Sequence, residues 1–140
     1  MNEDKYNLTR FLTAQEKMYN VALKELKEGY KQSHWMWYIF PQLKHLGCSY
    51  LSTFYGISGR EEAIAFLQNP ILSQRLREVS EAILQLTICD ATSIFGRIDS
   101  RKLMSSMTLF DAVSPDDIFA LVIEKFYQGK RDRRTVGQEK

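Results

Sequence analysis

The sequence lacks the features of an exported or membrane protein. It has only two cysteines, Cys48 and Cys89, too few for a disulfide framework, and we interpret both as small apolar core residues. Its longest apolar run, residues 35–40, is far shorter than the ~20 residues that span a bilayer. The start, residues 1–4, has neither the basic nor the apolar part of a signal peptide. We therefore expect a cytoplasmic protein with no membrane partner.

The motifs that identify common reactions and cofactors are also missing. There is no glycine-rich phosphate loop, no paired-cysteine zinc motif, no His-Glu-x-x-His and no nucleophile elbow. His34, His45, Cys48 and Cys89 could in principle supply four zinc ligands, but only His45 and Cys48 have a ligand-like spacing. We expect no metal site and no cofactor, and no motif names a reaction.

The chain also lacks a large excess of one charge sign, because its net charge is only +2. Residues 130–140 hold five Lys or Arg against two Asp or Glu, which leaves a net charge of −1 on residues 1–129. We interpret residues 130–140 as a solvated basic tail. Nucleic acid is not an expected partner, because the body has no basic stripe and no aromatic residue interrupts the cluster at residues 130–134.

What the sequence does contain is typical of one soluble globular domain. The chain has 140 residues, of which 44% are hydrophobic and 26% charged. Apolar residues at steps of three and four predict a first helix from Leu8 to Tyr30, with Asn7 as its N-cap and Gly29 as its end. Its solvent face is predicted to carry Lys17, Lys24, Glu25 and Glu28.

Capping residues and turns predict the later helices. Ser58 and Glu61 have capping-box spacing, Asn69-Pro70 marks a turn, and Ser114-Pro115 begins the last helix, which ends near Gly129. Between them we expect a helix over residues 71–86, a short helix capped by Asp90 and closed by Gly96, and another capped by Asp99 over residues 100–112. No alternating strand pattern persists. The predicted fold is all-α: a compact single-domain bundle of about six to seven helices over residues 1–140, with residues 1–6 as an N-terminal tail and one long aromatic loop over residues 42–57.

The stretch from Lys31 to Gln42 is the most distinctive part of the chain. We expect one or two helical turns in it, ending before Pro41. His34 is interpreted either as a structural histidine or as a partly buried general base, and of Trp35 and Trp37 one should face the core and the other a groove. Gln15 falls inside the apolar stripe of the first helix, where it is either a core amide bonded to a backbone carbonyl or a pocket wall.

A second group of polar residues lies on the helix predicted after Asp99. Lys102 precedes Ser105 and Ser106 by three and four residues, so both hydroxyls should lie near the lysine. Three interpretations remain open: a base and nucleophile, an anion-binding group, or an ordinary polar helix face.

These residues carry a resemblance to one family, the small bacterial domain of unknown function numbered eighteen-ten, sometimes labelled calpastatin-like. The matching stretches cover nearly the whole chain: residues 8–11, 14–15, 22–26, 31–42, 55–58, 69–72, 75–76, 95–96, 99, 102–110 and 126–132. The resemblance implies a compact, mostly helical domain and no established activity. It also implies the signature positions Gln15, Lys31, His34, Trp35, Gln42, Lys102, Ser105 and Ser106.

The leading hypothesis is a pocket that binds a small anionic or nucleotide-like ligand between the His34–Trp37 segment and the Lys102–Ser106 helix. Two alternatives remain: an interaction module whose aromatic loop exposes a tryptophan, and an enzyme with His34 as general base or Ser105 or Ser106 as nucleophile. The protein is expected to be a monomer or homodimer. The candidate ligand-binding residues are Gln15, Lys31, His34, Trp35, Trp37, Gln42, Lys102, Ser105 and Ser106.

Overall fold

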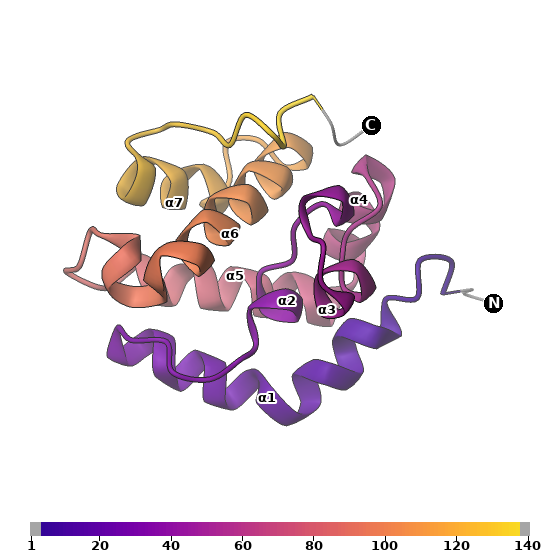
Figure 1. The fold of residues 1–140 in the computed structure, drawn as a ribbon, viewed down its shortest axis with the longest axis horizontal. Coiled ribbons are helices and arrows are strands. Elements are labelled where there is room, and N and C mark those ends of the chain that lie inside the picture. Colours follow the sequence, from indigo (N-terminus) through magenta and orange to yellow (C-terminus); the bar gives the residue numbers. More distant parts are fainter. Residues whose placement is uncertain (1–3, 138–140) are drawn as a thin grey trace.

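The computed structural model describes residues 4–137 and confirms the all-α fold class (Figure 1). Within this range, the only β-type pairing is a single bridge between Leu43 and Ile57. None of the helices described is long and apolar enough to cross a membrane. The helices are α1 (Thr9–Glu28), α2 (Met36–Ile39), α3 (Tyr50–Phe54), α4 (Arg60–Gln68), α5 (Pro70–Leu84), α6 (Ala91–Val113) and α7 (Ile118–Tyr127), with one 3-10 helix at Lys44–Leu46.

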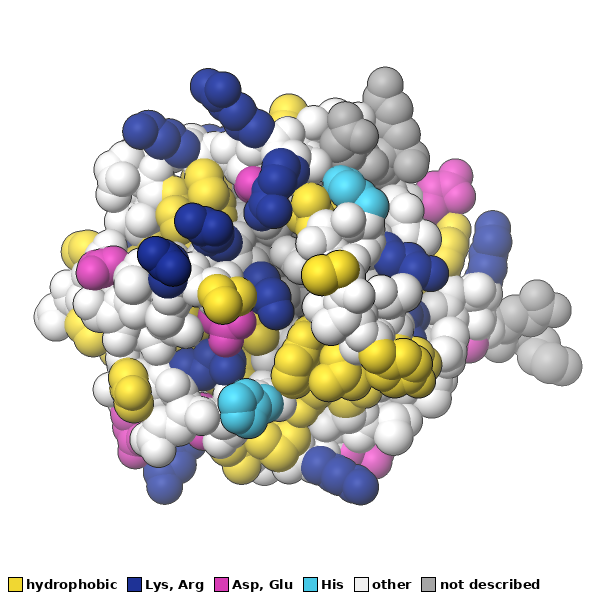
Figure 2. Space-filling model, viewed as in Figure 1, with side chains coloured by type: hydrophobic (Ala, Val, Ile, Leu, Met, Phe, Trp, Pro, Cys, Tyr) yellow, Lys and Arg dark blue, Asp and Glu magenta, His cyan; other side chains and the backbone are white. Residues whose placement is uncertain are grey.

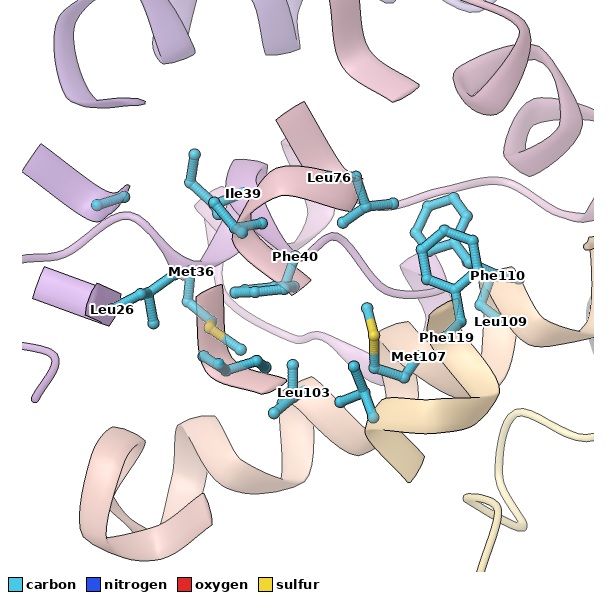
Figure 3. Close-up of a cluster of buried hydrophobic side chains, with 14 of the residues drawn as sticks. Leu26, Met36, Ile39, Phe40, Leu76, Leu103, Met107, Leu109, Phe110 and Phe119 are labelled. Carbon is cyan, nitrogen blue, oxygen red and sulfur yellow. The ribbon is translucent and has the colours of Figure 1, made fainter. Parts of the chain in front are cut away.

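The core lies between the long helices, with α5 in contact with α1, α4 and α7, and α6 packed against α7 and α4. The short helix α2 follows α1 and sends Met36, Ile39 and Phe40 into this core (Figure 3). Because these side chains are buried, the aromatic stretch is fixed mainly by packing and not by its own helix, which is too short to be stable alone. The predicted turn of helix before Pro41 is confirmed.

The predicted aromatic loop is more regular than expected. Residues 42–57 contain the 3-10 helix and α3, and the segment is closed at its base by hydrogen bonds from Lys44 N to Ile57 O (2.8 Å) and from Ile57 N to Gln42 O (2.9 Å). Glycine and serine residues in this segment hide the helical pattern, but Ser49 caps α3 by accepting a hydrogen bond from Ser52 N. This closure fixes the position of Gln42.

Several predicted helix starts are displaced by a few residues. Asp4, and not Asn7, caps α1, because its carboxylate accepts hydrogen bonds from Leu8 N (2.6 Å) and Thr9 N (2.9 Å). At α4 the Ser58 amide and hydroxyl donate to Glu62, and not to Glu61. At α7 the cap is Asp117, because Ser114 and Pro115 form a turn before the helix.

The break that the sequence predicts in α6 is present, but the second cap is not. Gly96 has φ 82° and ψ 166° and interrupts the helix, while Asp90 caps its start by accepting a hydrogen bond from Thr92 N. Asp99 lies inside the helix and pairs with Lys31, with 3.0 Å between Oδ2 and Nζ. The predicted role of Asp99 as a cap is therefore wrong.

The largest error in the predicted helix faces concerns Glu25, which is buried although the sequence places it on the solvent face. Its carboxylate accepts hydrogen bonds from Gln32 N (2.8 Å), Ser33 N (2.9 Å), the Ser33 hydroxyl (2.5 Å) and Trp35 Nε1 (2.9 Å). Burial alone would raise the pKa of this carboxyl, but these donors outweigh it and lower the pKa from 4.5 to about 2. Glu25 therefore fixes the turn from α1 into the aromatic stretch.

The C-terminal segment is not a solvated tail over residues 130–137. Asp132 and Thr135 are buried against α6. The Asp132 carboxylate accepts hydrogen bonds from Ser105 Oγ (3.0 Å) and from the Thr135 hydroxyl, and its amide donates to Thr108 Oγ1 (3.0 Å). Residues 138–140 of the predicted tail, and residues 1–3 of the N-terminal tail, lie outside the described residues. Both cysteines are exposed, so their interpretation as core residues is wrong.

Candidate functional site

Four of the predicted site residues belong to the core. Gln15 is buried, its Nε2 donates to Tyr38 O (2.8 Å), and its Oε1 accepts a longer hydrogen bond from Arg75 (3.3 Å). Trp35 is fully buried and bonded to Glu25, while Ser105 and Ser106 are fully buried in α6. The core-amide interpretation of Gln15 is therefore correct, and none of these four residues lines any of the pockets described below.

The geometry gives no support to a catalytic role for His34. Its side chain is exposed, contrary to the partial burial that the sequence suggests, and it makes no hydrogen bond to the described residues. The neighbouring Lys31 is held in place, since its ammonium donates to Ser33 O (2.6 Å), pairs with Asp99 and lies 4.9 Å from the centroid of the Trp35 ring.

The two serines of α6 also lack the environment of a nucleophile. Ser105 Oγ donates to Asp132 and lies 3.1 Å from Arg101 O. Ser106 Oγ has no hydrogen-bond partner among the described residues. Neither hydroxyl bonds to Lys102, so the predicted Lys-Ser pair does not form in this structure.

Three predicted residues do come together around a small cavity. Trp37, Gln42 and Lys102 line a space of about 10 Å³, which is room for roughly one water, together with Met36, Phe40, Ser52, Tyr55 and Gly56. Trp37 is half-buried, and the Lys102 ammonium lies 5.6 Å from the centroid of its ring. The cation and the aromatic face attract each other, which favours this position of the lysine beside the cavity.

A larger pocket adjoins this cavity and shares Gln42 and Lys102 with it. It has a volume of about 190 Å³, and we call it the basic pocket; it is lined by Gln42, Leu46, Ile98, Arg101, Lys102 and Arg134. Three of these six side chains carry a positive charge, and none carries a negative charge.

The acids near the basic pocket leave most of this charge uncompensated. Arg101 makes no ion pair within residues 4–137. Lys102 Nζ is 3.9 Å from Asp99 Oδ1, at the outer limit of an ion pair, and Asp99 is closer to Lys31. Arg134 Nε is 3.4 Å from Asp132 Oδ1, but that carboxylate is already held by Ser105 and Thr135.

The sequence missed Arg101 and Arg134 as functional candidates. Arg101 is exposed and adjacent to Lys102, but a single arginine on a helix has no pattern that separates it from an ordinary surface residue. Arg134 was assigned to the solvated tail. The signal that identifies it is Asp132, the acid within the basic cluster, because it anchors the segment that carries Arg134.

The basic pocket is part of a wider electropositive surface. Figure 2 shows Lys and Arg side chains gathered over α6 and the C-terminal segment, in the upper left of the view. Elsewhere in the described chain, no group of three or more His, Cys, Asp or Glu side chains is arranged to hold a metal ion.

The fold and the pocket define a small all-α protein with a basic surface pocket. The chain belongs to the DUF1810 family, described as a protein of unknown function, whose model matches residues 5–138. Among solved structures it is similar to the conserved hypothetical protein Rv1873 from Mycobacterium tuberculosis, with 44% identity, coverage of 95% of this chain and 96% of that chain, and a TM-score of 0.92. No curated protein matches the chain significantly.

Proposed function

We propose that this protein binds a small anionic ligand in the basic pocket. The observation that carries the proposal is the convergence of Arg101, Lys102 and Arg134 on one hollow, with no acid among the described residues of its wall. Clustered cations repel each other, and a hollow lined by one sign of charge concentrates ions of the opposite sign. An anion bound among these three residues would relieve that repulsion.

The chemistry of the pocket favours a phosphate or carboxylate head group. Guanidinium groups bind such anions through two parallel hydrogen bonds, and a lysine ammonium adds a compact point charge. The Gln42 side chain adds an amide donor to the same wall. A ligand with both a phosphate and an aromatic group would also reach Trp37, on the other side of Lys102.

The volume limits the size of the group that is enclosed. Pockets for drug-sized ligands measure about 300–1,000 Å³, whereas the basic pocket measures about 190 Å³. A phosphate, a small dicarboxylate or the phosphate end of a nucleotide fits this space, and a whole nucleotide would extend out of it.

A thermal-shift screen with inorganic phosphate, adenosine monophosphate and citrate tests the proposal, followed by calorimetric titration of each compound that gives a shift. A ligand that binds only the native state stabilises it by about 2.7 kcal/mol at a hundredfold excess over Kd. We expect K102A and R101A to weaken binding at least fivefold and to unfold within a few degrees of the wild type. K24A is the matched control, because Lys24 is an exposed cation on α1. Equal binding by K102A and K24A would exclude the basic pocket as the site.

A further inference from the structure

The basic pocket is one end of a series of three hollows that share lining residues, and we call this series the path. It shares Gln42 and Lys102 with the cavity at Trp37, and that cavity shares Gly56 with a hollow of about 430 Å³ beside α3. Among the residues that line this hollow are Lys44, Tyr50 and Phe54. The path therefore runs from the cations of α6 to the aromatic side chains of α3.

The aromatic end of the path is exposed. Tyr50 has 78% of its surface accessible and Phe54 has 41%, and the two rings stack with 6.0 Å between centroids and 14° between planes. Phe54 also packs edge-on against Tyr55, with 4.8 Å between centroids. Exposed aromatic rings of this kind are the side chains on which unpaired bases stack.

Arg10 lines the same 430 Å³ hollow but is not available to a ligand. Its guanidinium donates to the backbone oxygens of Tyr6, Asn7, Phe54 and Gly56 and pairs with Glu62 at 2.8 Å. It clamps α3 to α1 and so supports the aromatic pair. The cation of this hollow that remains exposed is Lys44.

The basic end of the path extends beyond the pocket. Seven cations lie on α6 from residue 97 onward and on residues 130–137. The same stretches hold three acids, Asp99, Asp111 and Asp132, and each is partly or fully buried and engaged in an ion pair. The cations are Arg97, Arg101, Lys102, Lys130, Arg131, Arg133 and Arg134. Figure 2 shows this basic region and a hydrophobic patch toward α3 on the same face of the molecule.

We infer that this face binds single-stranded nucleic acid, with backbone phosphates at the basic pocket and unpaired bases on Tyr50 and Phe54. The inference deepens the proposed function and rests on it, because it assigns the bound anion to a polymer. A single strand is the occupant that complements both ends, since it carries a regular row of negative charges and bases whose faces are free. A duplex offers the charges but keeps its bases stacked inside.

The sequence alone predicts no nucleic-acid binding, because the basic residues of α6 and those at 130–134 are far apart in the chain. From the sequence, residues 130–140 are expected to be a solvated tail, and the rest of the chain has no basic stripe. Docking of the C-terminal segment through Asp132 places the basic cluster beside α6, and the α3 fold supplies the aromatic residues that the cluster itself lacks.

Fluorescence polarisation tests the inference. The probes are labelled single-stranded RNA and DNA oligomers of about 12 nucleotides and the same sequences as duplexes, each titrated at a series of salt concentrations. We expect the single strands to bind more tightly than adenosine monophosphate and than the duplexes. R134A and R101A should each reduce the slope of log Kd against log salt by about one. Comparison of the RNA and DNA arms shows whether the 2′-hydroxyl contributes.

The aromatic contacts are tested by Y50A, with Y30A as the matched control, because Tyr30 is also an exposed tyrosine but lines none of the three hollows. We expect Y50A to weaken oligomer binding at least fivefold and to leave phosphate binding unchanged, while Y30A changes neither. Equal affinity of Y50A and Y30A, or equal binding of duplex and single strand, overturns the inference. If phosphate binds but oligomers bind no more tightly, the proposed function stands and the inference fails. If no anion binds, both fail.

Discussion

Removal of the Glu25 carboxylate should destabilise the protein more than its position near the end of α1 suggests. The group receives four hydrogen bonds, and one of the donors, Trp35 Nε1, belongs to a fully buried side chain. In E25A that donor is left without a partner, which costs about 1–3 kcal/mol, while the amides of Gln32 and Ser33 lie near the surface and regain water. With the lost charge-assisted hydrogen bonds included, we expect a total loss of about 3 kcal/mol.

For a domain of this size, that loss corresponds to a fall in Tm of about 10 °C. Urea unfolding followed by far-UV circular dichroism measures it, since domains of this length generally unfold in two states. E28A is the control, because Glu28 is an exposed acid one turn later on the same helix, and we expect its Tm to stay within about 2 °C of the wild type. An E25A protein as stable as E28A would refute the assigned role of the carboxylate.

The same carboxylate should make stability depend on pH. Its pKa is about 2 in the folded protein and 4.5 ordinarily, so its contribution is complete above about pH 4.5 and is lost as the pH falls towards about 2. E25Q keeps an acceptor for the three N–H donors but cannot titrate. The difference in free energy of unfolding between wild type and E25Q should therefore shrink from neutral pH to about pH 3. A difference that stays constant over this range would contradict the hydrogen-bond explanation.

Two further changes test other parts of the structure. D132A should release residues 130–137, which faster hydrogen exchange in that segment would show, and should weaken phosphate binding by displacing Arg134. It should also lower the free energy of unfolding by about 2 kcal/mol, because the buried Ser105 and Thr135 hydroxyls lose their acceptor. Slow exchange in D132A would show that other contacts hold the segment. G96A should lower the free energy of unfolding by about 1–3 kcal/mol through backbone strain alone, because φ 82° and ψ 166° suit only glycine and an added Cβ meets nothing within 4 Å. Urea unfolding measures this, and an unchanged urea midpoint would mean that the break in α6 shifts at no cost.

The helices could be predicted because their signals are local. Apolar spacing along α1, the cap at Asp90 and the break at Gly96 each depend on residues a few positions apart, so the chain itself specifies them. The cap partners were harder to predict, since several polar side chains near a helix start compete for the same amides. Asp4 was preferred over Asn7 and Glu62 over Glu61 only because the folded chain brings the right carboxylate within reach.

The candidate site depended on contacts that no local pattern encodes. Gln42, Lys102 and Trp37 line one small cavity, but His34 is exposed, and Gln15, Ser105 and Ser106 belong to the core. The polarity of these residues is the same in either environment, and only their burial separates a structural amide or hydroxyl from one that binds a ligand.

The sequence by itself determined the helical class, the order of the helices and the importance of the aromatic stretch, because each follows from periodicity and composition within short windows. Only the tertiary structure decided that Glu25 is a buried acceptor, that residues 130–137 dock through Asp132, and that Arg101, Lys102 and Arg134 share one pocket. These outcomes join residues about 10 to 33 positions apart in the chain, and such pairings are selected by burial and charge balance over the whole core.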